Sequence, residues 1–351
     1  MHLSVDYKPR FPADYRPGIG IIGCGGIVKG AHLKAYNKYG LNVVGVYDVN
    51  PAATQGVKEQ FGVQHIFGSL DELLSHPHVE VVDIATHPDQ RVDLMRKALE
   101  AGKHILAQKP LALEVEAARE IVEEAARRGL KVAVNQNGRW APPWRIATLL
   151  VEQGAISDVL AVTHLYDIKF GWIPGTPFDE LKHFAIYDYS VHWIDITRCW
   201  LQGKSVASVR ARDYRTPNQV AEGKTPWGMW VEIAYEGGAN AMMRGIGCAE
   251  TRKGGHPFWI HGTEGTIRGS VLGGDFVEME KDGVSSRYEL EGQWFPDGFG
   301  GTMGELLCAI AEDREPFNSA RHNLLSLQMT LAACQSADED GTPVAIEEIL
   351  S

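Results

Sequence analysis

Short apolar runs alternate with amphipathic stretches along the chain up to residue 137. The amphipathic stretches, such as EVEAAREIVEEAARRG, have helical spacing, and Gly129 stands where a helix C-cap is expected. Short apolar strands between helices are typical of a parallel sheet that is covered on both faces. The pattern therefore predicts a doubly wound α/β domain, with strands in Ile19–Gly23, in LNVVGVYD ending at Asp48, in Val79–Ala85, in His104–Ala107 and in VAV before Asn135.

After Gly138 the apolar positions begin to alternate with polar ones. In WGMWVEIAYE, Met229, Val231 and Ile233 fall on one face of an extended chain, and Glu232 falls on the other. Glycine-rich turns such as EGGAN and LGGD separate these runs, and a last helix is expected over 324–337. The sequence thus predicts an N-terminal extension (1–17), the doubly wound domain (18–137) and an α+β domain with a mostly antiparallel sheet (138–351).

Composition excludes several classes of protein. The chain has 351 residues, a formal net charge of −11 and no run of Lys and Arg, so we expect no nucleic-acid partner. No apolar stretch reaches the length of a membrane span, so we expect no membrane partner. The five cysteines are scattered without a CxxC, which fits a reducing compartment, and we expect a cytoplasmic protein. His76-Pro77-His78 has no third ligand nearby, so we predict no metal site.

A glycine-rich loop, Gly23-Cys24-Gly25-Gly26-Ile27-Val28, joins the first predicted strand to a helix. In a dinucleotide site the first glycine makes the turn, and the second lets the main chain approach the pyrophosphate at the helix N-terminus. Val28 stands where a third Gly or Ala is expected, so the motif by itself also fits a plain strand-to-helix turn. We predict that Gly23, Gly25, Gly26 and Ile27 bind a dinucleotide.

Asp48 strengthens this prediction. It ends the second strand, where an acidic side chain accepts hydrogen bonds from the adenosine ribose hydroxyls. A carboxylate would repel a 2′-phosphate, and no Arg follows in VNPAA, so we expect NAD rather than NADP. The alternative is that Asp48 is a turn residue before Asn50-Pro51.

Polar residues also follow three later strands. They are Thr86-His87-Pro88, Gln108-Lys109-Pro110 and Gln136-Asn137 with Arg139. Ligands of open parallel sheets bind beyond the carboxyl ends of the strands, so we predict cofactor contacts from Thr86, Pro88, Gln108, Lys109 and Gln136. Lys109 could stabilise a developing alkoxide, or it is a solvent-exposed lysine before a turn. Arg139 holds a polar substrate or caps the last strand.

Several of these segments together resemble one family. The segments GIIGCGGI, AGKHILAQKPLAL, DYSVH and the late GTEGTIRG, with Asp48, are similar to the Gfo/Idh/MocA oxidoreductases over nearly the whole chain. The resemblance implies a Rossmann domain followed by an open-faced sheet domain that often forms the oligomer interface, so we expect a homodimer or homotetramer. The family's Glu-Lys-Pro corresponds to Gln108-Lys109-Pro110, and a family His corresponds to Arg91.

Asp188 and His192 lie four residues apart in IYDYSVHWID. On a helix this spacing places both on one face, with Asp195 and Cys199 in the same stripe. An isolated pair of this kind is most often a structural hydrogen bond. The resemblance implies instead that both residues face the substrate beside Lys109, with His192 as the general base and Asp188 orienting it.

These expectations lead to one principal function and two alternatives. The principal prediction is an NAD-dependent dehydrogenase acting on a hydroxyl carbon of a sugar, polyol or sugar derivative, with Lys109, Asp188 and His192 assisting proton transfer. The predicted substrate-binding residues are Arg139, Trp172, His183 and His192. One alternative is cleavage of a glycoside by transient oxidation and elimination with bound NAD. The other is a non-catalytic NAD-binding sensor.

Overall fold

A computed structural model describes residues 3–249 and 255–347, and the chain divides into two compact units. The first unit comprises Lys8–Trp140 and Gln293–Leu324. The second comprises Met1–Tyr7, Ala141–Gly292 and Leu325–Ser351. The units and the predicted domains divide the chain differently, because 293–324 lies far along the sequence from the rest of the first unit.

The described part of the first unit contains a six-stranded parallel sheet in the order β3-β2-β1-β4-β5-β6. This is the order of a classical dinucleotide-binding sheet, and it confirms the predicted doubly wound fold. The direction of winding reverses between β1 and β4, and ligands bind at such a switch point. The strands are β1 (Ile19–Ile22), β2 (Val43–Tyr47), β3 (His65–Ile66), β4 (Val81–Ile84), β5 (His104–Ala107) and β6 (Val132–Val134).

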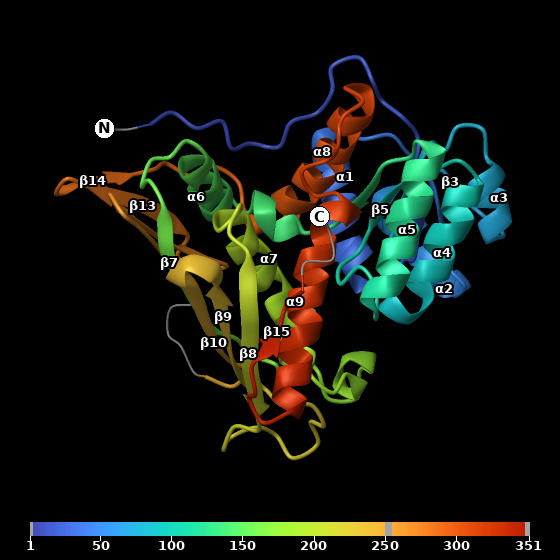
Figure 1. Ribbon diagram of the computed structural model, residues 1–351. Coiled ribbons are helices and arrows are strands. Elements are labelled where there is room, and N and C mark those ends of the chain that lie inside the picture. Colours follow the sequence, from blue (N-terminus) through green and yellow to red (C-terminus); the bar gives the residue numbers. More distant parts are fainter. Residues whose placement is uncertain (1–2, 250–254, 348–351) are drawn as a thin grey trace. The chain divides into compact units, whose positions relative to one another are not determined.

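Helices and helical turns connect these strands. They are η1 (Val28–His32), α1 (Leu33–Tyr39), α2 (Pro51–Phe61), α3 (Leu70–Ser75), α4 (Pro88–Glu100), α5 (Val115–Arg128) and η2 (Asn137–Trp140). Figure 1 labels β3 and β5 of this sheet and the helices α2, α3, α4 and α5 of the same unit. Helix α5 ends at Gly129, which has φ 66°, as expected for a left-handed C-cap. The η1 turn is π-helical, a geometry that occurs mostly as single turns and often at functional sites.

The segment 293–324 supplies η6 (Trp294–Gly298) and α8 (Phe299–Ala311) to the first unit. Phe299, Met303 and Leu306 are buried in the same hydrophobic core as β1 and α1. Their spacing places them on one face of α8, and burying that face stabilises the helix against the strands. Residues that are remote in sequence therefore complete the core beneath the glycine-rich loop.

The described part of the second unit contains a nine-stranded sheet in the order β14-β13-β12-β11-β7-β10-β9-β8-β15. Only β7 and β10 pair in parallel, which confirms the prediction of a mostly antiparallel α+β domain. The strands are β7 (Val159–Asp167), β8 (Val206–Tyr214), β9 (Gly228–Tyr235), β10 (Asn240–Ile246), β11 (His256–Gly262), β12 (Thr266–Val271), β13 (Phe276–Lys281), β14 (Val284–Arg287) and β15 (Val344–Ala345).

The two faces of this sheet differ. Along β9, Val231 and Ile233 are buried, whereas Trp230 and Glu232 are partly exposed, as the period of two predicts. The helical elements are α6 (Pro142–Glu152), η3 (Pro177–Glu180), η4 (Ala185–Ser190), α7 (Val191–Trp200), η5 (Glu236–Gly238) and α9 (Ala320–Asp338), whose first residues belong to the other unit. Within the described ranges, no helix is long and apolar enough to cross a membrane.

Candidate functional site

The glycine-rich loop leaves β1 at the switch point of the first unit's sheet. Gly23 has φ 97°, and a Cβ there would lie 2.7 Å from the carbonyl oxygen of Ala85, so the turn itself requires glycine. A Cβ at Gly25 or Gly26 would meet no atom within 4 Å, so packing within the protein does not explain either glycine. Both are exposed, and a main chain without side chains at this point can approach a phosphate closely.

Asp48 follows β2 and is fixed beside this loop. Its Oδ2 accepts the backbone N–H of Cys24 at 2.7 Å, and its Oδ1 accepts that of Asn50 at 2.8 Å. Burial, and secondarily the Asp48 carboxylate, raises the pKa of the Cys24 thiol to about 12, so the thiol stays protonated at neutral pH. Each carboxylate oxygen retains a lone pair, and the carboxylate is held ready to accept further hydrogen bonds.

Two side chains at the strand ends have buried polar atoms with no hydrogen-bond partner among the described residues. They are the hydroxyl of Thr86, after β4, and both amide atoms of Gln136, after β6. Gln136 is only 1% exposed. Leaving a buried amide unpaired costs about 1–3 kcal/mol, so a folded protein rarely tolerates it without a functional reason. Gln136 therefore has donor and acceptor capacity that a ligand can use.

Lys109 follows β5, and its main chain is held from both sides. Its N–H donates to Oε1 of Gln108 at 2.8 Å. The carbonyl of the next residue, Pro110, accepts a hydrogen bond from the buried guanidinium of Arg91, which also donates to the carbonyl of Thr86. Arg91 thus joins the segments after β4 and β5, a role that sequence reasoning did not assign to it.

Sequence reasoning also missed a buried polar cluster beneath the loop. His32, at the end of η1, contacts Asp83 of β4, and Gln108 and Asn135 after β5 and β6 contact the same imidazole. The sequence did contain one signal for this cluster. Asp83 interrupts the apolar run of β4, and all four residues of that strand are buried. A carboxylate in such a strand needs partners, and a search for them would have led to nearby polar residues.

Asp188 and His192 belong to the second unit. Asp188 lies in η4, which is π-helical, and His192 lies in the first turn of α7. Both side chains are partly buried. The stripe predicted for an ideal α-helix places Asp195 beside them, yet Asp195 is 1% exposed and accepts a hydrogen bond from Ser326 at 2.7 Å. The pair therefore stands apart from the core-facing part of the predicted stripe.

His183 makes hydrogen bonds through both ring nitrogens. Nδ1 lies 2.8 Å from Oδ2 of Asp213, and Nε2 lies 3.0 Å from Oδ1 of Asp338. The hydrogen bond to Asp213 is the main reason that the pKa of His183 is raised. These contacts give His183 a structural role in the second unit, and its predicted contact with substrate stays a prediction.

Two other predicted substrate ligands have contrasting surroundings. Trp172 is 54% exposed and makes T-shaped ring contacts with Phe178 and Phe184, so part of its side chain is accessible. Arg139 is 2% exposed, donates to the carbonyl of Phe317 at 2.5 Å and lies over the Phe317 ring. The Arg139 contacts agree with the structural alternative, in which this residue fixes the end of β6.

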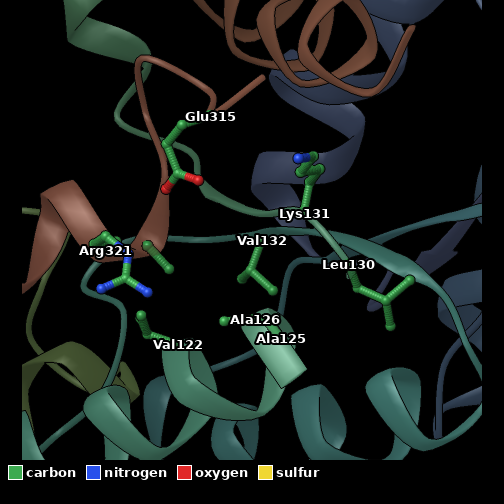
Figure 2. A pocket seen from close by; sticks show the side chains of 9 residues that line it. Val122, Ala125, Ala126, Leu130, Lys131, Val132, Glu315 and Arg321 are labelled. Atoms are coloured by element: carbon green, nitrogen blue, oxygen red, sulfur yellow. The ribbon is translucent and has the colours of Figure 1, made fainter. Parts of the chain in front are cut away.

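Two cavities of the first unit lie away from the strand ends that carry these residues. One of them has a volume of about 50 Å³ and lies between the last turns of α5 and the start of β6. Figure 2 shows side chains that line it, among them Val122, Lys131, Glu315 and Arg321. It lies at the amino end of β6, whereas ligands of parallel sheets bind at the carboxyl ends. Residues 3–249 and 255–347 contain no cluster of three His, Cys, Asp or Glu side chains suited to a metal ion.

Known proteins similar to this chain include several oxidoreductases. D-apiose dehydrogenase of Paraburkholderia graminis is 25% identical over 341 residues, which cover 92% of this chain and 88% of that protein. A crystal structure of an oxidoreductase from Agrobacterium radiobacter, in complex with NAD⁺, L-tartaric acid and magnesium, superposes with a TM-score of 0.85 at 22% identity, covering 96% of this chain and 100% of that one.

A structure of levoglucosan dehydrogenase in complex with NADH and levoglucosan has a TM-score of 0.80 at 24% identity and covers 95% of this chain and 100% of that one. At this identity the structural likeness supports the fold.

Two family models together cover most of the chain. The model described as an oxidoreductase family with an NAD-binding Rossmann fold matches residues 18–136. The model of the C-terminal alpha/beta domain of the same family matches residues 149–346. These matches confirm the resemblance seen in the glycine-rich loop, in AGKHILAQKPLAL and in GTEGTIRG. They also confirm the predicted class of NAD(P)-dependent dehydrogenase. The chain therefore belongs to the Gfo/Idh/MocA family of nicotinamide-dependent oxidoreductases.

Proposed function

We propose that the protein is an NAD-dependent dehydrogenase that oxidises or reduces one hydroxyl-bearing carbon of a sugar, polyol or sugar derivative. The observation that carries the proposal is the set of open glycines and unpaired buried polar atoms at the carboxyl ends of the first unit's strands. Gly25 and Gly26 face open space, and Thr86 and Gln136 have buried polar atoms with no partner among the described residues. A dinucleotide fits this set of donors and acceptors.

Residues of the loop and strand ends would hold the cofactor. The main chain at Gly25, Gly26 and Ile27 would bind the pyrophosphate at the start of η1. The amide of Gln136 matches the donor and acceptor of a carboxamide group, which the nicotinamide ring carries.

Asp48 supports NAD as the cofactor rather than NADP. Its two oxygens already accept the N–H groups of Cys24 and Asn50, which fixes the carboxylate, and each can still accept one ribose hydroxyl. A 2′-phosphate would place two negative charges side by side, because Val49 and Asn50 bring no cation.

Proton transfer is assigned to three side chains. His192 accepts the proton of the substrate hydroxyl, and Asp188 orients the imidazole or a second hydroxyl. The ammonium group of Lys109 donates a hydrogen bond to the substrate oxygen and stabilises its developing negative charge. When bound, NAD supplies the hydride acceptor, so the carbon-bound hydrogen leaves with its electron pair while the proton goes to His192. Trp172 offers an exposed ring for stacking.

The decisive experiment follows nicotinamide absorbance and product chromatography together. The purified protein with NAD is given inositols, aldoses, sugar acids and glycosides, and turnover is compared with that of Lys109→Met. We expect NADH to form with one substrate class, and the variant to lose about 10²–10⁴-fold in kcat while still binding NAD. Lys58→Met, an exposed lysine of α2, serves as the matched control. Full turnover by Lys109→Met would exclude the assigned role of Lys109.

The same experiment separates the alternatives. Glycoside cleavage without net NADH would indicate transient oxidation and elimination. NAD binding without turnover of any substrate in either assay would favour a sensor.

We also propose a homo-oligomer that associates through the outer face of the second unit's sheet. On this face Met242 is 55% exposed, and Trp230 and Trp259 are partly exposed, whereas the opposite face is buried. Exposed apolar side chains on a wide sheet favour burial against a second copy. Light scattering on wild type and on Met242→Glu tests this, and an unchanged mass in the variant would contradict it.

A further inference from the structure

The proposed function gives no role to His32 and Asp83, which lie at the centre of the buried polar cluster. His32 and Asp83 are fully buried in the first unit, with Nδ1 of the imidazole 2.7 Å from Oδ2 of the carboxylate. The same Oδ2 accepts the hydroxyl of Tyr36 at 2.6 Å. Burial and the Asp83 carboxylate raise the pKa of Tyr36, so its hydroxyl remains a donor.

The far side of the imidazole faces two amides whose orientations can be assigned. Oε1 of Gln108 accepts the N–H of Lys109, so its Nε2 is the atom 3.2 Å from Nε2 of His32. Oδ1 of Asn137 accepts the indole N–H of Trp294 at 2.6 Å, so its Nδ2 is a donor, and it donates to Oδ1 of Asn135 at 3.4 Å. The Nδ2 of Asn135 is therefore the atom 3.3 Å from the same nitrogen of His32. An amide nitrogen only donates, and Nε2 of His32 therefore has to be an acceptor.

This pattern fixes the protonation of the imidazole. With Nε2 accepting from two amides, the single ring proton lies on Nδ1 and is donated to Asp83. If Nε2 carried a second proton, that proton would point at two N–H donors, and the hydrogen bonds from Gln108 and Asn135 would be lost. Gln108 occupies the position of the family's acid, and a carboxylate there would favour a proton on Nε2. The glutamine of this chain is thus matched to a neutral histidine.

The neutral imidazole joins four segments of the first unit. His32 ends the helical turn that follows the glycine-rich loop, and it contacts β4 through Asp83 and the ends of β5 and β6 through the two amides. Gln108 then holds the N–H of Lys109. The position of the loop and the position of Lys109 are therefore linked through the side chains of His32 and Gln108.

We propose that His32, as the neutral tautomer with its proton on Nδ1, is a positioning residue that fixes the glycine-rich loop and Lys109 relative to each other, and that Gln108 keeps it neutral. The role of Lys109 in catalysis rests on the proposed function, but the tautomer and the coupling do not. Preorganisation of this kind sets how well a site binds without the residue itself touching a ligand.

The first test is the tautomer, measured by ¹⁵N NMR on protein labelled in its imidazole rings. One of the 13 histidines should give the signals of a neutral ring protonated at Nδ1, and these should vanish in His32→Asn. In Gln108→Glu the same ring should become an imidazolium. A wild-type His32 that is charged, or protonated only at Nε2, would overturn the proposal, and this measurement needs no variant to be active.

The second test measures the coupling without turnover. Calorimetry gives NAD affinity, and mass spectrometry gives the rate at which Lys109 is methylated by formaldehyde and a borohydride reagent. We expect His32→Asn to weaken NAD binding about tenfold and to change the methylation rate at least about threefold, since small displacements cost binding and orientation steeply. If His32→Asn does not fold, Gln108→Leu replaces it, with a change in Lys109 methylation expected.

His104→Asn provides the matched control. His104 starts β5, at the opposite end of the strand from Gln108, and its Nδ1 accepts the N–H of Lys131 at 2.9 Å. This control should leave both readouts within about twofold of wild type. If His32→Asn keeps both the NAD affinity and the Lys109 methylation rate of the wild type, the proposed coupling between the loop and Lys109 is wrong. A wild-type protein that binds no NAD would overturn the proposed function alone, because the tautomer and the methylation rate would still decide the present proposal.

Discussion

Two glycine-rich turns of this protein use the same residue for opposite reasons. In the loop after β1, a side chain at Gly25 would meet nothing within 4 Å. In the GTEGT turn after β11, a Cβ at Gly262 would lie 2.2 Å from the carbonyl oxygen of Ile156, and one at Gly265 would lie 2.7 Å from that of Glu280. Glycine in the second turn lets two protein segments pack closely. Packing does not explain glycine in the first turn, where we propose that the open space admits the cofactor.

The largest expected effect comes from filling the open loop. Gly25→Val should lower NAD affinity at least about 100-fold, or about 2.7 kcal/mol, because its side chain would occupy the path of the pyrophosphate. The free energy of unfolding should change by no more than about 0.5 kcal/mol, since nothing in the protein is displaced. Calorimetric titration with NAD and thermal unfolding measure the two quantities. If Gly25→Val binds NAD with wild-type affinity, the loop is not part of the cofactor site.

Filling the packed turn should have the reverse effect. Gly262→Ala should destabilise the protein by about 2–3 kcal/mol, because the Cβ meets main chain that cannot move aside cheaply. NAD affinity should stay at the wild-type value, since Gly262 lies in the second unit. Thermal unfolding should show a lowered midpoint, and calorimetric titration should show an unchanged affinity for NAD. Wild-type stability would show that Ile156 and its neighbours shift more easily than the packing implies.

The sequence predicted most strands of the two sheets, but it did not predict where every segment of the chain is placed. The buried strands β1, β4, β5 and β6 were recognisable because apolar runs and turn residues are local signals. Helix α8 was not predicted, although Phe299, Met303 and Leu306 stand at helical spacing and give it an apolar face. Which core receives that face depends on contacts across the chain, and local pattern carries no such information.

The site shows the same limit. The sequence predicted Gly25, Asp48 and Lys109 as site residues because their motifs place them at the ends of strands. It did not identify His32 or Arg91, because each acts through buried hydrogen bonds to segments remote in sequence. A polar residue in a helix normally indicates an exposed face, and hydropathy cannot distinguish it from a buried one that has found partners. The π-helical turns at His32 and Asp188 left no local signal either.

A third substitution tests whether the strand ends are adapted for binding at the expense of stability. Gln136→Leu removes a buried amide that has no partner among the described residues and replaces it by an apolar group of similar size. The unfolding free energy should rise by about 1 kcal/mol, while NAD affinity should fall about tenfold. Gln60→Leu, on the exposed face of α2, is the control and should change neither. A loss of stability in Gln136→Leu would mean that the amide has partners in the protein.

The smallest expected effect concerns His183, whose ring nitrogens both face carboxylates of the second unit. Its pKa is raised, chiefly by the hydrogen bond to Asp213 and further by Asp338. Because the folded pKa exceeds the unfolded value near 6.5, the protonated ring stabilises the fold fully below about pH 6.5, and this contribution is lost as pH rises through the folded pKa. The contribution should be about 0.5 kcal/mol, because Asp338 is 45% exposed and the pair is screened by solvent.

His183→Gln should therefore lower the thermal midpoint at pH 6 and leave it nearly unchanged at pH 9, with the difference between wild type and variant falling steadily between them. Asp338→Asn should reproduce part of the effect, since it removes the more exposed of the two carboxylates. Both variants should keep the substrate KM of the wild type if His183 belongs to the packed, self-satisfied part of the molecule. A raised KM with unchanged stability would instead place His183 among the substrate ligands. A side chain of the second unit that already has two hydrogen-bond partners in the protein would then also bind substrate.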